Sequence, residues 1–217
     1  MDLNIIQKIA IYALPVIFAI TLHEAAHGFV AKHFGDTTAY MLGRVSLNPL
    51  RHIDPIGTVL VPLLTLMLGG ILFGWAKPVP VNFSQLRNPK KDMLWVAAAG
   101  PMSNLAMAVF WAFTIKIATL MPDNGMALPL ALMGQAGVTI NLVLMVLNLL
   151  PLPPLDGGRI AVSLLPNHLA YRYAQIEPYG MIILVLLMFS GVLSSILWPF
   201  ISLGMGLLGA VFGISLG

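Results

Sequence analysis

The 217-residue sequence has no cysteine and few charges, since Lys, Arg, Asp and Glu together make up only 9% of it. Without cysteine, disulfide bonds and thiolate ligands are excluded, and any metal site must use histidine and carboxylate side chains. An ordinary soluble domain is about one-quarter charged, whereas 59% of this chain is hydrophobic and its mean hydropathy is +0.91. The composition therefore predicts an integral membrane protein.

What the sequence does contain is a series of long apolar runs, and a helix that crosses a bilayer needs about 20 apolar residues. Four runs have about that length, one run (56–73) is shorter, and one (201–216) is rich in glycine. In chain order the six runs are 5–30, 56–73, 94–120, 130–150, 181–197 and 201–216. We therefore expect an all-α polytopic membrane protein with about five or six membrane segments.

Basic residues are concentrated in three polar segments, at 32–51, 77–91 and 159–172. The connection 121–129, by contrast, contains Asp123 and no basic residue. Because Lys and Arg in short loops favour the cytoplasmic side of a membrane, we expect the three basic segments to face the cytoplasm.

This topology places both ends of the apolar run 56–73 on one side of the membrane, so we expect a re-entrant or interfacial segment there. Pro62 and the Gly69–Gly70 pair fit a broken element of this kind. Membranes tolerate such irregular backbone where it is buried in protein or faces water. An ordinary crossing helix stays open as the alternative, because the charge rule has exceptions.

The polar segments that flank this run have the composition of extended structure. Asn-Pro and Asp-Pro breaks near Thr, Tyr and Val in 37–57 favour short strands and turns. Alternate prolines in Trp75–Val81 favour an edge strand, because proline cannot donate to a ladder. We expect a short cytoplasmic-side β/re-entrant region over about 37–92, within a core at 1–165 that precedes a carboxy-terminal transmembrane hairpin at 166–217.

The first apolar run contains the motif His23-Glu24-Ala25-Ala26-His27, which has the form H-E-x-x-H. Residues four apart share a helical face, so His23 and His27 can reach one Zn²⁺. Glu24 lies one position round the helix, where a carboxylate can take a proton from water. Ionisable groups inside a bilayer cost about 3 kcal/mol each, and metal binding would offset that cost. The alternative is a polar cluster that packs helices together.

A catalytic zinc normally has three protein ligands, so one more is needed. Asp156 is the candidate, because it lies in NLLPLPPLDGGR at 148–159, directly after an apolar run. The three prolines in this stretch must interrupt the helix and can direct side chains inward. An additional or alternative role for Asp156 is as the N-cap of a helix that starts at Gly157.

HEAAH and NLLPLPPLDGGR together resemble the site-2 protease family of intramembrane metalloproteases, and AAGPMSN at 98–104 resembles that family's Gly-Pro-x-x-Asn segment. GRVSLNPLRHIDPIG and GWAKPVPVN further resemble the compact bacterial members that have no PDZ or CBS domain. The resemblance covers residues from about 20 to 160, so it does not include the carboxy-terminal hairpin.

The resemblance implies a site and a location. One zinc ion per chain would be bound by His23, His27 and Asp156, with Glu24 as the general base and Asn148 helping to hold the substrate or the oxyanion. The protein would be a multi-pass protein of a bacterial cytoplasmic membrane, with its active site opening toward the cytoplasm. Its partners would be a transmembrane protein or peptide substrate and the lipid bilayer, and not a nucleic acid.

The expected function is hydrolysis of peptide bonds in or near the transmembrane segments of membrane proteins, as in regulated intramembrane proteolysis. A metal-ion or proton-coupled transporter is the main alternative, because buried His, Glu and Asp also mark ion pathways. Transporters often have a broken segment in each of two matched halves, and the proline-broken segment here has no counterpart. A membrane scaffold without activity is the third possibility, although the intact Glu24 argues against it.

The segment Trp75–Val81 and the residue His52 suggest how a substrate could approach the site. An edge strand at Trp75–Val81 could capture an unwound substrate by strand addition. His52 could gate the site or act as a transient ligand, although a surface histidine in a basic loop is the simpler interpretation. The oligomeric state stays open.

Overall fold

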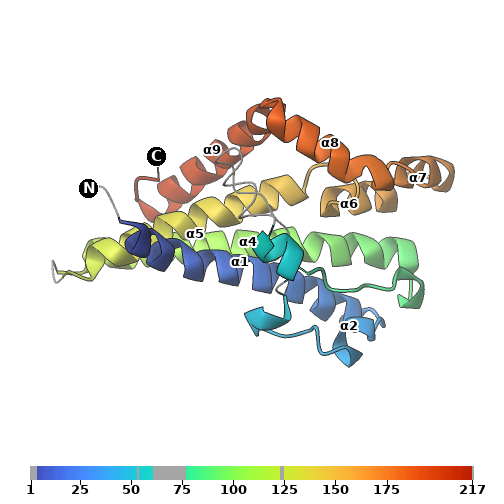
Figure 1. Ribbon diagram of the computed structural model, residues 1–217, viewed down its shortest axis with the longest axis horizontal. Helices are drawn as coiled ribbons and strands as arrows, with labels where there is room; N and C mark the ends of the chain where they lie inside the picture. The colour runs from blue at the N-terminus through green and yellow to red at the C-terminus, as the bar shows by residue number, and fades with distance from the viewer. Residues whose placement is uncertain (1–3, 53, 61–76, 123–124, 217) are drawn as a thin grey trace.

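The computed structural model describes residues 4–52, 54–60, 77–122 and 125–216 (Figure 1). The described chain is helical and contains no β-strand, which confirms the all-α class. Its α-helices are α1 (Ile5–His33), α2 (Thr38–Met41), α4 (Pro89–Leu120), α5 (Ala127–Asn148), α6 (Asp156–Leu164), α7 (Asn167–Ala174), α8 (Glu177–Phe189) and α9 (Val192–Phe212). Three shorter turns of helix are η1 (Pro49–Arg51), η2 (Pro55–Leu60) and η3 (Phe83–Gln85).

Among the described residues, four helices are long and apolar enough to cross a membrane: α1 from Ile9, α4, α5 and α9. The chain is therefore a multi-pass membrane protein. The apolar run 181–197 is not a single segment, because α8 ends at Phe189 and α9 starts at Val192. Gly191 makes the turn between them with a φ of 75°, a backbone conformation that glycine adopts without steric cost.

The region 37–92 differs from the expected short strands wherever it is described. The predicted strand segment 37–57 forms α2, η1 and the start of η2, and Lys77–Val81 forms neither a helix nor a strand. Asn48 caps η1 by accepting a hydrogen bond from the Leu50 N–H, so a local side-chain contact favours helical turns here. Residues 61–73 of the proposed re-entrant run, and Trp75, lie outside the described residues.

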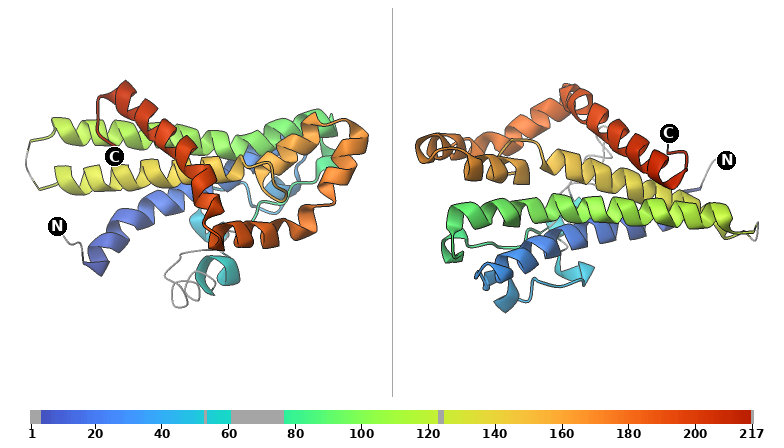
Figure 2. Two further views of the ribbon diagram at one scale, coloured as in Figure 1. Left: turned by 90° about the horizontal axis from the view of Figure 1, so that it is seen from above. Right: turned by 180° about the vertical axis from the view of Figure 1, so that it is seen from behind.

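The three helices α1, α4 and α5 lie side by side along the long axis of the molecule, and α9 crosses α5 obliquely (Figure 2). The core between α4 and α5 contains Trp111 and Ile115 from α4 and Leu142 from α5. Gly137 permits this packing, because a Cβ there would overlap the Trp111 ring. Small residues that let helices approach closely are typical of membrane packing, where van der Waals contact replaces the hydrophobic effect.

The chain reverses sharply between α5 and α6, and this reversal places Asp156. Prolines after Asn148 prevent α5 from continuing, and Asp156 is the first residue of α6, not its N-cap. A Cβ on Gly158 would lie 2.7 Å from the Pro153 Cα, and one on Gly157 would collide with the backbone carbonyls of Leu149 and Leu150. Only glycine therefore fits at these two positions of the return.

Candidate metal centre

His23 and His27 project from one face of α1 toward Asp156 at the start of α6. Both histidines are buried, and their Nε2 atoms lie 3.2 Å apart. The Asp156 Oδ2 atom lies 3.2 Å from His23 Nε2 and 3.4 Å from His27 Nε2. The structure thus brings together the three residues that the sequence proposed as metal ligands.

These three distances match what a tetrahedral metal ion requires. Ligand atoms at the usual zinc distances occupy corners of a tetrahedron that lie about 3.3 Å apart. The separations of the His23, His27 and Asp156 donor atoms, at 3.2 to 3.4 Å, are therefore already those of a three-ligand zinc site with one open corner. The donor set, two imidazoles and one carboxylate, is also one that catalytic zinc sites use.

The protonation of the two imidazoles is set by what their other nitrogens contact. His27 Nδ1 lies 2.7 Å from the backbone carbonyl oxygen of Val96, which can only accept a hydrogen bond. His23 Nδ1 lies 2.6 Å from Asn104 Oδ1. Both Nδ1 atoms therefore donate, so each Nε2 of the neutral ring presents a lone pair to the centre.

The orientation of the Asn104 amide is fixed by a chain of hydrogen bonds across α4 and α5. Asn104 Nδ2 donates to the Ala19 carbonyl and to Asn141 Oδ1, at 3.3 and 3.0 Å. Asn141 Nδ2 in turn donates to the Gly137 carbonyl at 2.8 Å. Both asparagines are fully buried. Because backbone carbonyls end this chain, Asn104 Oδ1 can only accept, which holds the His23 ring in one tautomer.

With both histidines in this tautomer, three acceptor atoms face one another in a buried space. Asp156 Oδ2 is buried and has no hydrogen-bond partner among the described residues. Unpaired buried acceptors of this kind repel one another unless a cation lies between them. This arrangement, with the tetrahedral spacing, fits a divalent metal ion.

Gly100 of α4 provides the room for that ion. A Cβ built at this position would lie 2.6 Å from His23 Nε2 and would overlap His27 Nε2. The AAGPMSN segment therefore serves the centre twice, because Gly100 leaves it open and Asn104 orients a ligand. The sequence singled out this segment by resemblance only, and it gave no signal for the roles of Asn141 or the Val96 carbonyl.

Glu24 contacts the segment that precedes α4. Its Oε2 atom accepts a hydrogen bond of 2.7 Å from the Val79 N–H. Val79 lies between Pro78 and Pro80, which have no N–H, so of these three residues only Val79 has a backbone donor. This hydrogen bond restricts the orientation of the Glu24 carboxylate.

The sequence also singled out Asn148 and His52, and each side chain lies within hydrogen-bond distance of a backbone carbonyl. Asn148 is the last residue of α5, and its Nδ2 atom donates to the Leu144 carbonyl at 3.0 Å. His52 is only 2% exposed, so its interpretation as a surface histidine is wrong. Its Nε2 atom lies 2.8 Å from the Ser46 carbonyl oxygen, and His52 is the C-cap of η1.

A family model described as "Peptidase family M50" matches residues 114–191. The protein of Bacillus subtilis (strain 168) named "Putative zinc metalloprotease YwhC" is 39% identical over 197 residues, which cover 88% of this chain and 85% of the relative. This chain belongs to peptidase family M50. Membership of this family, together with a donor set suited to zinc, makes the chain a zinc metalloprotease.

Other relatives extend the likeness to mycobacteria. The protein named "Putative zinc metalloprotease Rip2" in Mycolicibacterium smegmatis is 32% identical over 183 residues, which cover 82% of this chain and 66% of the relative. The protein of the same name in Mycobacterium tuberculosis is 35% identical over 144 residues, which cover 64% of this chain and 51% of the relative. No solved structure matches the chain.

Replacing Asn104 with alanine should weaken zinc binding by about 10- to 100-fold, the usual effect of losing a partner that orients a ligand. The His23 ring would lose the acceptor that holds its Nδ1–H. A competition titration with a zinc-chelating dye measures the affinity. Asn104→Asp keeps an acceptor oxygen and should therefore bind zinc more tightly than Asn104→Ala does.

The matched control for Asn104 is Gln135→Ala, which removes an exposed amide from α5 and should leave zinc affinity unchanged. Wild-type affinity in the Asn104→Ala protein would show that Asn104 does not orient His23.

Proposed function

We propose that this M50 peptidase hydrolyses peptide bonds in or beside the transmembrane segments of membrane proteins. In this proposal His23, His27 and Asp156 hold one zinc ion, and Glu24 is the general base. The observation that carries it is the convergence, at tetrahedral spacing, of two imidazole Nε2 atoms from a helix long enough to cross a bilayer and one carboxylate oxygen from the start of α6.

The chemistry assigned to the chain's own residues is proton transfer and positioning. A bound zinc ion would supply a Lewis acid that polarises the scissile carbonyl and makes water easier to deprotonate. Glu24, one position round α1 from His23, would take a proton from the attacking water and return it to the leaving amine. The contact with Val79 supports this role, because it orients the carboxylate without neutralising it.

Asn148 would support the substrate from the end of α5. One of its amide hydrogens is used by the Leu144 carbonyl, and an amide has two. The second hydrogen is suited to donate to a substrate carbonyl or to the oxyanion that develops from it. Its position directly before the turn that delivers Asp156 supports this assignment.

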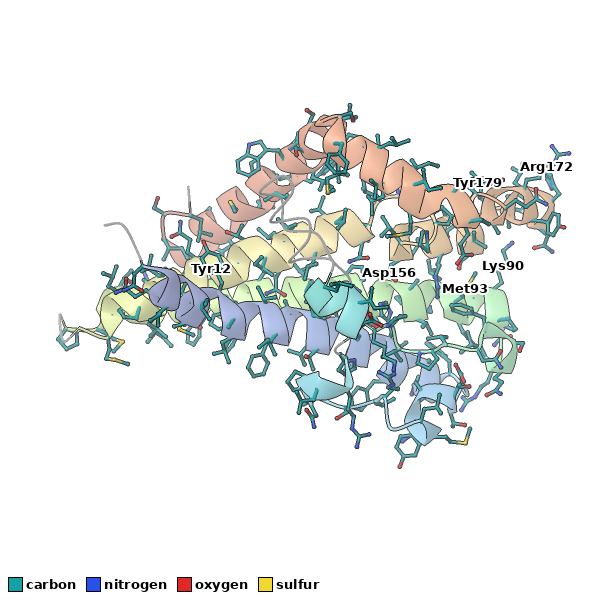
Figure 3. All side chains as sticks on the ribbon, in the orientation of Figure 1. Tyr12, Lys90, Met93, Asp156, Arg172 and Tyr179 are labelled. Carbon is teal, nitrogen blue, oxygen red and sulfur yellow. The ribbon has the colours of Figure 1, made fainter. Side chains whose placement is uncertain are left out.

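The site lies between the two ends of the helical bundle. His23 is about ten residues from the end of α1, or about 15 Å along a helix. Figure 3 shows Asp156 between Tyr12, toward one end of the molecule, and Lys90 and Arg172, toward the other. The end with the basic residues would face the cytoplasm. We infer a site below the lipid surface of a bacterial cytoplasmic membrane that opens to the cytoplasm.

The catalytic core would consist of residues 1–165, and 166–217 would form a carboxy-terminal membrane hairpin. A re-entrant segment between α1 and α4 and a substrate-binding edge at Trp75–Val81 stay predictions. Regulated intramembrane proteolysis is the process that this activity would serve. A substrate helix would have to be unwound locally before its carbonyls could be attacked, because they are hydrogen-bonded within the helix.

The test of this function is hydrolysis of a fluorogenic single-span peptide by the detergent-purified protein. Treatment with a zinc chelator should reduce cleavage to background, and adding zinc back should restore it, because the three ligands can rebind the ion. A zinc-flux assay in proteoliposomes should show no transport. Cleavage that does not depend on zinc, or zinc flux without cleavage, would contradict the proposal.

A further inference from the structure

A second polar feature of the structure is an open surface cavity of about 310 Å³, whose lining includes none of the three metal ligands. It lies where the turn after α2 meets η1 and the start of the segment that leads to α4. The residues that line it are Leu42, Gly43, Arg44, Leu50, Arg51 and Lys77. Three of these six residues are basic, and none of those described is acidic.

The backbone around this cavity is organised by its two arginines. The Arg44 guanidinium donates to the Arg51 carbonyl, and the Arg51 guanidinium donates to the Gly43 carbonyl. Gly43 has a φ of 64°, and a side chain there would collide with the Arg51 guanidinium. These reciprocal contacts hold both cations at the cavity.

Most of the hydrogen-bond donors at this cavity have no acceptor among the described residues. A guanidinium has five N–H groups, and each arginine donates one to a carbonyl among the described residues. The Lys77 backbone N–H donates to the His52 carbonyl at 2.9 Å, which fixes the position of this residue. Its ammonium group has no hydrogen-bond or ion-pair partner in the described part of the chain. Three cations with spare donors therefore face one space, as a phosphate group requires.

Large apolar side chains are exposed in the same segment as Arg44 and Arg51, outside the membrane-spanning helices, and two of them, Leu42 and Leu50, line the cavity. Met41, Leu42, Leu47 and Leu50 are 71%, 63%, 60% and 73% exposed. Exposed apolar groups beside basic groups are typical of a surface in contact with the headgroup and acyl boundary of a membrane. The cavity follows the end of α1, which carries Lys32 and His33 in its last turn.

We propose that this cavity binds the phosphate-bearing headgroup of an anionic phospholipid. Arg44, Arg51 and Lys77 bind the phosphate, and the exposed leucines contact the acyl chains. A free phosphate ion would use the cations but would gain nothing from the leucines. A phosphatidylcholine headgroup would bring a quaternary ammonium group that three cations repel. Basic pockets on the cytoplasmic side of membrane proteins are suited to anionic headgroups in this way.

Native mass spectrometry of the full chain in detergent tests the proposal, with dioleoyl phosphatidylglycerol as the probe and dioleoyl phosphatidylcholine for comparison. We expect one tightly bound phosphatidylglycerol per chain and no comparable phosphatidylcholine adduct. Lys77→Gln should weaken phosphatidylglycerol binding roughly fivefold, and the triple variant Arg44→Gln/Arg51→Gln/Lys77→Gln about 100-fold, from the contribution of each basic residue near an anionic surface. Lys77→Gln keeps the test valid if the triple variant does not fold.

A matched control removes three basic residues from outside the cavity, in Arg87→Gln/Lys91→Gln/Arg172→Gln. This protein has the same net charge as the cavity triple variant and should bind phosphatidylglycerol like the wild type. Equal losses in the two triple variants would overturn the proposal, because they would indicate attraction by net charge alone. Equal binding of phosphatidylcholine by the wild type would also overturn it.

The proposed contact of Leu42 and Leu50 with the acyl chains distinguishes binding of a lipid from binding of a free phosphate ion. Leu42→Ser/Leu50→Ser keeps all three cations and should weaken phosphatidylglycerol binding. If this variant bound the lipid normally and millimolar inorganic phosphate displaced the lipid from the wild type, the ligand would be a free phosphate and the lipid proposal would be wrong.

Discussion

Replacing Glu24 with glutamine is expected to lower the rate of peptide hydrolysis by about 10²- to 10⁴-fold, the range for loss of a general base, while zinc stays bound at one ion per chain. Glutamine has the size of glutamate, and its side-chain oxygen can still accept the Val79 N–H. It cannot take a proton from water. Cleavage of a single-span peptide gives the rate, and metal analysis of the same sample gives the zinc content.

The control for Glu24 is Glu177→Gln, which makes the same chemical change in the first turn of α8 and should leave the rate unchanged. A Glu24→Gln protein that hydrolyses the peptide at the wild-type rate would show that Glu24 is not the general base. One that has lost its zinc would show that Glu24 acts on the metal site itself.

Replacing Gly100 with alanine is expected to abolish zinc binding although no ligand is changed. The added methyl group would occupy the space between His23 and His27, within 2.6 Å of one Nε2 atom and closer to the other. Neither α1 nor α4 can move away easily, because the Val96 carbonyl and Asn104 connect them. We expect zinc affinity to fall by more than about 100-fold, beyond the usual effect of an altered outer partner.

The comparison for Gly100 is Gly206→Ala in α9, where a Cβ would meet no atom within 4 Å. This variant should keep its zinc and gain slightly in helix stability, because alanine favours helix more than glycine does. Circular dichroism of both proteins reports whether they fold. A folded Gly100→Ala protein that binds zinc normally would show that the ion does not occupy the space beside Gly100.

The ligands could be proposed from the sequence because their signal is local. His23 and His27 are four residues apart on a helix, and that spacing alone places them on one face. Asp156 required a longer argument from the prolines before it, and the family resemblance supported the choice. The all-helical class followed from the length and hydropathy of the runs, which is the strongest constraint on a chain in a membrane.

Contacts between distant residues could not be predicted in the same way. Asn104 is 81 positions from His23 in the chain, and nothing in either local sequence relates their side chains. The burial of His52 and the cavity around Arg44 depend on how the segment after α2 folds back, and short polar segments with several prolines are compatible with strands or with turns. Gly191 in the run 181–197 is compatible with a break between two helices, but a single glycine is also tolerated inside a membrane helix, so the sequence does not distinguish the two.

The sequence by itself determined that this chain is helical and spans a membrane, and that two histidines and a glutamate share one stretch of helix, because periodicity and hydropathy act over neighbouring residues. The tertiary structure decided which nitrogen of each histidine faces the centre, how much space Gly100 leaves there, and which carbonyl and amide groups hold the rings. These properties depend on the packing of α1 against α4 and α5. Helix packing is set by the combined fit of many side chains, and no single segment of the sequence contains that information.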